Sequence, residues 1–317
     1  MGWKRKLNFA TMTEYIMPIR YVSMEEEFKR NPELKMSDLQ MLKDWMDKQP
    51  HLPDIPILYL IIFLHSNYYH IEPTKSTIEN FFTVRWRMPE VFYNRDPVAW
   101  KELRKAFTVV ALILLQQRTK ENYIMIFGKL LDTNPSRYNY VETLKYLFMT
   151  CEVQNITEGT SSGQVIVFDA TGFSLGHVGR MNLMLLKKIL FFVQEEGAPV
   201  RLKVIHVLNA IPAAETLLNM LKPFMKANLL NIVHFHANIK SAEEFLPIEA
   251  LPNEMGGKAG PLKDLVDMNI KLLEEFRPWF LQDERILRVN ESLRVGKFQA
   301  ADDLFGVDGS FKKLEID

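Results

Sequence analysis

The chain has 317 residues, of which 47% are hydrophobic, and its 39 basic and 39 acidic side chains give a formal net charge of zero. This length and composition predict about two globular domains with a sizeable core, and the balanced charge excludes a global field that would draw the molecule to nucleic acid. The single cysteine, Cys151, excludes an internal disulfide and suits a reducing compartment, so we expect a cytoplasmic protein.

The first hundred residues predict a series of helices. Residues 36–50 begin with a capping-box pattern at Ser37 and Gln40. One face of this segment is apolar at helical spacing: Leu39, Leu42, Trp45 and Met46. A second helix is expected from Ile57 to Leu64, and a third follows Pro73.

A proline-bearing polar stretch, residues 88–97, is the expected domain boundary. After it, short β-branched runs alternate with longer helical segments; the runs are residues 123–127, 165–168, 204–208 and 232–236. Such runs are typical of a mostly parallel sheet covered on its faces. We therefore expect three parts: an N-terminal helical domain (residues 1–95), an α/β domain (residues 96–275) and a C-terminal helical extension and tail (residues 276–317).

The stretch VIVFDATGFSLG, residues 165–176, leads a strand into the G-x-S-x-G pattern of a nucleophile elbow, with Ser174 at the nucleophile position. A hydrolase of this type needs an acid and then a histidine after the serine. The acids available before the last histidine are Glu195, Glu196 and Glu215. A serine hydrolase using Glu215 with His234 or His236 is one interpretation; the other is that both glycines only permit a tight turn.

Three histidines are expected on neighbouring strands. His234 and His236 lie two apart and share a strand face, which His206 can join from the next strand. Three imidazoles can bind zinc, but histidines in sheets are more commonly core residues. Phosphate-loop and dinucleotide patterns are absent, because Gly256, Gly257 and Lys258 are followed by Ala259. We therefore expect no metal, no cofactor and no catalytic residue.

The segment from Pro212 to Leu230 has more apolar surface than one sheet can cover. Four polar residues form a narrow stripe at helical spacing: Glu215, Asn219, Lys222 and Lys226. The apolar residues spread over roughly 160°, whereas a helix resting on a sheet needs only about 100°. Pro223 cannot donate to the carbonyl of Asn219 and disfavours helical angles at Lys222, so a kink or break is expected there. The segment is either a hinged apolar flap or a helix buried between two layers.

A second apolar segment, from Met181 to Val193, has only Lys187 and Lys188 to face water at its centre. Two such helices beside a sheet can enclose a cavity lined by Leu, Ile, Phe and Met. They can equally form an ordinary core.

Several stretches of the chain resemble the CRAL-TRIO lipid-binding family (cellular retinaldehyde-binding and Trio type), and most of all its α-tocopherol transfer protein-like branch. The matching stretches are LKDWMDKQPHLP (42–53), VFDATGFSLGH (167–177), IHVLNAIP (205–212), LKPFM (221–225), IVHFH (232–236) and LPNEMGG (251–257). They occur in the family's order and span about residues 30 to 265. Together they are specific, although each alone is weak.

This resemblance implies a helical N-terminal domain and a lipid-binding α/β domain whose sheet is the floor of a pocket under a mobile gate helix, here residues 212–230. It implies a soluble intracellular carrier that moves one tocopherol-, retinoid- or carotenoid-like lipid between membranes, with no enzymatic activity. The expected partners are the lipid and, transiently, a membrane surface, and we expect a monomer. Carried over by motif, the lipid-binding residues are Leu147, Thr150, Phe168, Phe173, Ile189, Phe192, Leu202, Leu217, Met220, Leu221 and Met225.

The chain departs from the family where relatives bind phosphoinositide headgroups. IIFLHSN, residues 61–67, replaces a basic run, and only Arg201 and Lys203 remain at matching basic positions. Two basic residues make a weak anionic site. A phosphatidylinositol-type lipid sensor or adaptor of the same fold is the alternative function.

Overall fold

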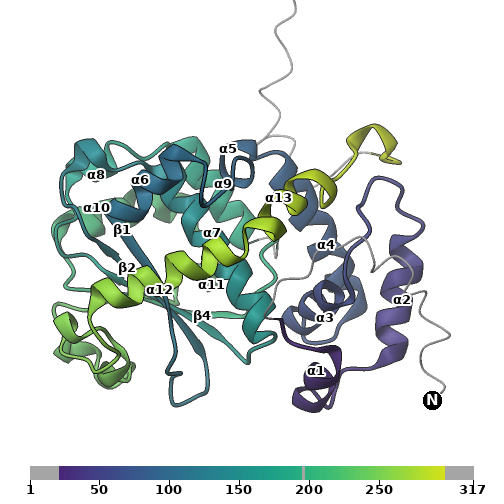
Figure 1. The fold of residues 1–317 in the computed structure, drawn as a ribbon, viewed down its shortest axis with the longest axis horizontal. Helices are drawn as coiled ribbons and strands as arrows, with labels where there is room; N and C mark the ends of the chain where they lie inside the picture. Colours follow the sequence, from purple (N-terminus) through teal and green to yellow (C-terminus); the bar gives the residue numbers. More distant parts are fainter. Residues whose placement is uncertain (1–20, 195–196, 297–317) are drawn as a thin grey trace, which may run out of the picture.

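The computed structural model describes residues 21–194 and 197–296. The N-terminal part is helical as expected and lies at one end of the molecule (Figure 1). Its helices are α1 (Met24–Arg30), α2 (Met36–Met46), α3 (Ile57–Ser66), α4 (Ile71–Trp86) and α5 (Pro89–Phe92). The predicted capping box at Ser37 is wrong, because α2 begins earlier, at Met36, and the N-cap residue is Lys35. The capping box that does form is at Ser23 and Glu26, where α1 begins.

A five-stranded sheet in the order β1-β2-β3-β4-β5 forms the second part. The strands are β1 (Val110–Leu115), β2 (Ile124–Leu130), β3 (Gln164–Asp169), β4 (Leu202–Leu208) and β5 (Val233–Phe235). The last four run parallel, as predicted from the four β-branched runs, and β1 is antiparallel to β2. Strand β1 was not predicted, because its continuous apolar run, VALILL, is as compatible with a buried helix.

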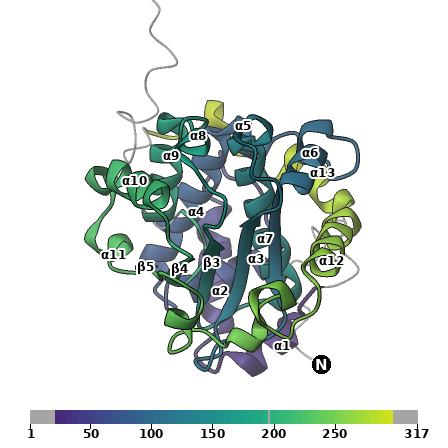
Figure 2. The same ribbon diagram turned by 90° about the vertical axis from the view of Figure 1, so that its left-hand side faces the viewer.

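Helices cover both faces of the sheet. They are α6 (Lys101–Val109), α7 (Tyr140–Glu158), α8 (Leu175–Val178), α9 (Leu183–Gln194), α10 (Pro212–Leu221), α11 (Ala227–Leu230), α12 (Leu262–Glu275) and α13 (Arg277–Ile286). Single 3-10 turns lie at Pro135–Arg137, Lys222–Phe224 (η4), Lys240–Ala242, Ile248–Ala250, Asn253–Met255 and Glu291–Leu293. Figure 2 shows α10 and α11 beside β4 and β5, and α12 at the opposite side of the sheet.

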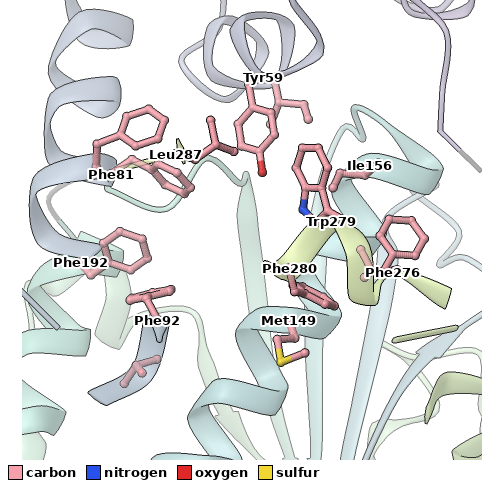
Figure 3. Close-up of a cluster of buried hydrophobic side chains, with 14 of the residues drawn as sticks. Tyr59, Phe81, Phe92, Met149, Ile156, Phe192, Phe276, Trp279, Phe280 and Leu287 are labelled. Atoms are coloured by element: carbon pink, nitrogen blue, oxygen red, sulfur yellow. The ribbon is translucent and has the colours of Figure 1, made fainter. Parts of the chain in front are cut away.

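Two hydrophobic cores lie on the two faces of the sheet. The larger joins the N-terminal helices to α7, α9 and α13, and Figure 3 shows part of it. The smaller lies under the segment 239–266 and includes Val165, Val167 and Leu208. The expected α/β fold with an N-terminal helical part is confirmed. The division at residues 95 and 275 stays a prediction, and within the stretch 88–97 Val91, Phe92 and Arg95 are fully buried.

Candidate lipid-binding site

One face of the sheet carries a grid of apolar side chains that are only half-buried. The strand register aligns two rows of side chains across β3, β4 and β5: Ile166, Ile205 and Val233 in one row, and Phe168, Val207 and Phe235 in the other. On the opposite face of the same strands Val165, Val167 and Leu208 are fully buried. Because β3 and β4 each have neighbours on both sides, incomplete burial of one face means an incomplete cover above it. We call these six residues the floor.

The cover above the floor is made by α9 and α10, and α10 is poorly packed. Of its ten residues only Ala213 and Ala214 are buried. Leu217 and Leu221 are half-buried, while Met220 and Phe224 of the following turn are 44% and 41% exposed. The surplus apolar surface predicted for this segment therefore remains partly open.

The break predicted at Pro223 is confirmed, but it falls further along the chain than expected. Lys222 keeps helical angles, φ −43° and ψ −44°, and Met225 is the first extended residue, φ −94° and ψ 131°. The side chain of Gln194, the last residue of α9, bridges the break. Its Nε2 donates to the carbonyl of Phe224 at 3.1 Å, and its Oε1 accepts from the backbone N–H of Lys226.

A cavity of about 130 Å³ lies between the N-terminal helices and α7, α9 and the start of β4. Four of the predicted lipid-binding residues line it: Leu147, Ile189, Phe192 and Leu202. Ile166 of the floor also lines it, so cavity and floor are continuous. Figure 3 shows Phe81, Phe92 and Phe192 near one another, with Phe192 centred 6.2 Å from Phe81 and 5.9 Å from Phe92.

Sequence reasoning missed the part of the lining that comes from the N-terminal helices: Tyr59, Ile62, Phe81, Arg85 and Phe92. No local pattern indicates these residues, because only the docking of α3, α4 and α5 against α7 and α9 brings them there. It also missed Cys151, which helical spacing does indicate, because it lies one turn after Leu147 on α7.

The remaining predicted residues lie outside this cavity. Thr150 is buried on α7 and accepts a hydrogen bond from Nδ2 of Asn269 on α12 at 3.4 Å. Phe173 stacks on His177, with ring centroids 5.4 Å apart. Phe168 belongs to the floor, and four residues belong to the gate segment: Leu217, Met220, Leu221 and Met225.

The two basic residues predicted as a weak phosphoinositide site are engaged with the turn between α3 and α4. Nε of Arg201 donates to the carbonyl of His65 at 2.9 Å, and its guanidinium lies 4.0 Å from the ring centre of Tyr68. Nζ of Lys203 donates to the Tyr68 hydroxyl at 3.0 Å. Burial and the adjacent Arg201 lower the pKa of His65 to about 3, so this imidazole adds no charge at neutral pH.

Ser174 is the N-cap of α8. Nδ1 of His177 accepts from the Ser174 backbone N–H at 3.1 Å and lies 2.9 Å from its Oγ. Burial lowers the pKa of His177, and its Nε2 has no partner among the described residues. A nucleophilic serine needs a histidine oriented by an acid. Among the residues that the structure describes, Ser174 makes no hydrogen bond to Glu215, His234 or His236, and Glu195 and Glu196 lie outside them.

The three histidines do come together: His206 lies on β4, His234 on β5 and His236 directly after β5. Nδ1 of His206 lies 2.8 Å from Nε2 of His236, and Nδ1 of His236 lies 3.3 Å from the carbonyl of Ser241. The ring centre of His234 is 5.8 Å from that of His206. Burial and the neighbouring histidines lower the pKa of His206 to about 4. Within residues 21–194 and 197–296, no group of three or more His, Cys, Asp or Glu side chains is arranged to hold a metal ion.

No helix in the described ranges is both long enough and apolar enough to span a bilayer.

Comparisons with known proteins agree with this architecture. Residues 31–101 match the Pinta-like UBA domain and residues 110–257 match the CRAL/TRIO domain. The chain is 29% identical over 252 residues to the human protein "Alpha-tocopherol transfer protein-like", covering 78% of this chain and 72% of that one. It is 23% identical over 245 residues to mouse "Clavesin-1", covering 74% of this chain and 67% of the relative. The crystal structure of Sfh5 superposes with a TM-score of 0.50 at 13% identity, over 80% of this chain and 98% of Sfh5.

A half-covered apolar floor that continues into a cavity is suited to an apolar small molecule. Residues 110–257 of this chain are a CRAL/TRIO domain, the domain of a family of lipid-binding and lipid-transfer proteins.

Proposed function

We propose that this protein carries one small hydrophobic lipid, of tocopherol, retinoid or carotenoid type, through the cytoplasm as a monomer and transfers it between membranes. The lipid lies on the floor and extends into the cavity, under α9 and α10. The observation that carries the proposal is the half-burial of the six aligned floor side chains. The name of the human relative, "Alpha-tocopherol transfer protein-like", supports the same class of ligand.

The energetic need for such a carrier follows from the hydrophobic effect. Each CH₂ group exposed to water costs about 0.8 kcal/mol, so lipids leave membranes slowly without a carrier. Drug-sized ligands occupy pockets of roughly 300–1,000 Å³, whereas the cavity measures about 130 Å³. Most of the ligand must therefore lie over the floor, and α10 must move to admit it.

The gate segment is suited to opening at a bilayer. Met220 and Phe224 are exposed, and Nζ of Lys187 lies 4.0 Å from the ring centre of Phe224. Apolar side chains flanked by lysines favour contact with the interface of an anionic membrane. In this mechanism the apolar face of α10 exchanges the ligand for lipid chains. Arg201 and Lys203 act at most as a weak headgroup site.

The proposed lipid-binding residues are those predicted from the family: Leu147, Thr150, Phe168, Phe173, Ile189, Phe192, Leu202, Leu217, Met220, Leu221 and Met225. Ten of them are apolar, so selectivity depends on the shape of the site and on few polar contacts. Ser174 acts as a helix cap and takes no catalytic part.

The test is lipid loading of the purified protein, measured by native mass spectrometry and lipid extraction. The wild type is expected to carry one lipid per chain. Leu217→Asp places a charge against the ligand and is expected to abolish loading, because a buried unpaired carboxylate is strongly unfavourable. The matched control is Leu281→Asp on α13, where the leucine is exposed, and it is expected to load normally.

Both variants are expected to keep the wild-type circular dichroism spectrum. Full loading of Leu217→Asp contradicts the assignment of the gate. A wild-type protein that neither carries lipid nor accepts it from vesicles contradicts the carrier function itself.

A further inference from the structure

The cavity has one charged wall, and this wall holds a hydrogen-bond donor without an acceptor. Arg85 of α4 lines the cavity and is 1% exposed. Its two terminal nitrogens donate to Oε1 of Glu152 at 2.5 Å and to Oδ2 of Asp283 at 2.9 Å. Its Nε–H has no hydrogen-bond partner among the described residues. Because a buried donor left unpaired is costly, the site favours a guest that brings an acceptor.

The guanidinium of Arg85 is held in a fixed orientation. Its central carbon lies 4.6 Å from the ring centre of Phe81 and 4.5 Å from that of Phe92. Both rings also line the cavity. Two aromatic faces and two carboxylates leave the planar group little freedom. The direction of the Nε–H bond is therefore set before any ligand arrives.

The charges around Arg85 already balance. Two buried cations, Arg85 and Arg95, and the partly buried Arg288 face the carboxylates of Glu152 and Asp283. A third carboxylate, that of Glu284, accepts from the backbone N–H of Arg95 at 2.6 Å. An additional anion in this apolar cavity would have no counter-charge, and an uncompensated buried charge is strongly unfavourable. The acceptor that the site favours is therefore an uncharged oxygen.

The volume of the cavity decides which part of a lipid fits there. About 130 Å³ is close to the roughly 150 Å³ of an apolar cavity that accepts a benzene ring. A six-membered ring or a group of similar size fits, but a long chain does not. Ile166 lines the cavity and also belongs to the floor, so a tail attached to that ring can continue over the floor.

We propose that the ligand is a lipid with one compact, uncharged, oxygen-bearing head group, bound with that head inward so that its oxygen accepts from the Nε–H of Arg85. The tail lies on the floor beneath α9 and α10. This inference rests on the proposed carrier function and deepens it by assigning Arg85 as the residue that binds the polar end of the ligand and so sets its orientation.

The test compares three probes that share a twelve-carbon chain: 4-dodecylphenol, dodecylbenzene and dodecyl phosphate. Binding is measured by displacement of a fluorescent fatty-acid analogue from the full chain. The wild type is expected to bind dodecylphenol about five- to tenfold more tightly than dodecylbenzene, because one neutral hydrogen bond changes the affinity by about this factor. It is expected to bind dodecyl phosphate most weakly. Arg85→Lys keeps the charge but removes the Nε donor. This variant is expected to bind dodecylphenol and dodecylbenzene with about equal affinity.

The matched control is Arg95→Lys. Arg95 is buried in the same cluster and pairs with the same two carboxylates, but it does not line the cavity. This variant is expected to keep the wild-type preference. An unchanged preference in Arg85→Lys, an equal loss in Arg95→Lys, or preferred binding of dodecyl phosphate overturns the inference. If all three probes bind equally, the inference about the head group fails while the carrier function stands. If none of them binds, the carrier function fails too.

A measurement on the wild type keeps the test decisive if Arg85→Lys does not fold. The Arg85 Nε–H signal, assigned by through-bond NMR correlations, is expected to shift on addition of dodecylphenol and to stay unchanged with dodecylbenzene. An equal response to both probes contradicts the hydrogen bond.

Discussion

At the scale of single residues, the floor depends on a glycine in the neighbouring strand. A Cβ at Gly128 of β2 would lie 2.7 Å from Cδ1 and 2.9 Å from Cε1 of Phe168. Real Cβ atoms do not approach so closely, so the missing side chain gives the Phe168 ring its place against the sheet. A larger residue at this position would push the ring up into the space proposed for the ligand.

Gly128→Ala is therefore expected to lower the free energy of unfolding by about 1–3 kcal/mol and to reduce lipid loading. Urea denaturation and native mass spectrometry measure the two effects. The control is Gly179→Ala at the end of α8, where an added Cβ meets only Leu175 O at 3.5 Å and Gly176 O at 3.8 Å. That change is expected to alter stability by less than about 0.5 kcal/mol. Equal behaviour of the two variants would show that Phe168 is not confined by Gly128.

At the scale of elements, the gate is a broken helix tied to its neighbour. Pro223 lacks an N–H, so the chain leaves the helix through η4 and becomes extended at Met225. The backbone groups of Phe224 and Lys226 lie beside the end of α9, where Gln194 serves both. One side chain therefore couples the two covering helices above the floor.

Gln194→Ala is expected to loosen this joint without unfolding the domain. Loss of the hydrogen bonds to Phe224 and Lys226 should raise amide exchange in residues 224–230 by about tenfold, equivalent to roughly 1.4 kcal/mol. Hydrogen–deuterium exchange measured by mass spectrometry tests this expectation. The rate of lipid transfer between vesicles should also rise and is measured on the same variant. Gln116→Ala, at an exposed glutamine after β1, is the control. Unchanged exchange in residues 224–230 would contradict the coupling.

At the scale of the whole molecule, a buried ionic cluster joins segments that are distant in the sequence. Arg85 comes from α4, Arg95 follows α5, Glu152 belongs to α7, and Asp283 and Arg288 belong to α13 and the segment after it. Burial alone would raise the pKa of Asp283, but the positive charges of Arg85, Arg95 and Arg288 outweigh it and hold the pKa below its usual range. The cluster links the N-terminal helices, the lipid-binding domain and the C-terminal helices.

Asp283→Asn is expected to destabilise the protein by about 3–5 kcal/mol at pH 7, because it leaves buried arginines without a counter-charge. Because the pKa of Asp283 is lowered in the folded state, the ionised carboxylate contributes to the free energy of unfolding at pH values above its unfolded-state pKa of about 4. This contribution is lost as the pH falls from that value through the lower, folded-state pKa. The difference between wild type and variant should therefore shrink in acid. Denaturant titrations at pH 7 and at low pH measure this.

The control is Asp267→Asn, which removes an exposed ion pair with Lys263. It is expected to leave the denaturation midpoint nearly unchanged at both pH values, because solvent screens an exposed ion pair. A similarly small effect of Asp283→Asn at pH 7 would mean that the cluster does not hold the three parts together.

Local patterns predicted the elements that depend on local chemistry. The alternation of β-branched runs with helices gave the four parallel strands, and Pro223 indicated the break in the gate segment. The predictions failed at positions where contacts with residues distant in the sequence determine the local structure. The helix α2 begins before Ser37, and β1 is a strand only because β2 pairs with it. Leu147, Ile189, Phe192 and Leu202 were predicted for the pocket and line the cavity, whereas Phe81 and Arg85 were not predicted.

The sequence by itself determined the class of fold, the family and the excess of apolar surface in the covering helices, because hydrophobic periodicity and short motifs are local properties of the chain. Only the tertiary structure decided where that excess surface lies and which polar group lines the adjoining cavity. The floor arises from the register of three strands, and Arg85 reaches the cavity because α4 packs against α9, more than a hundred residues away. Contacts of this kind are set by packing between distant elements, which no single stretch of sequence encodes.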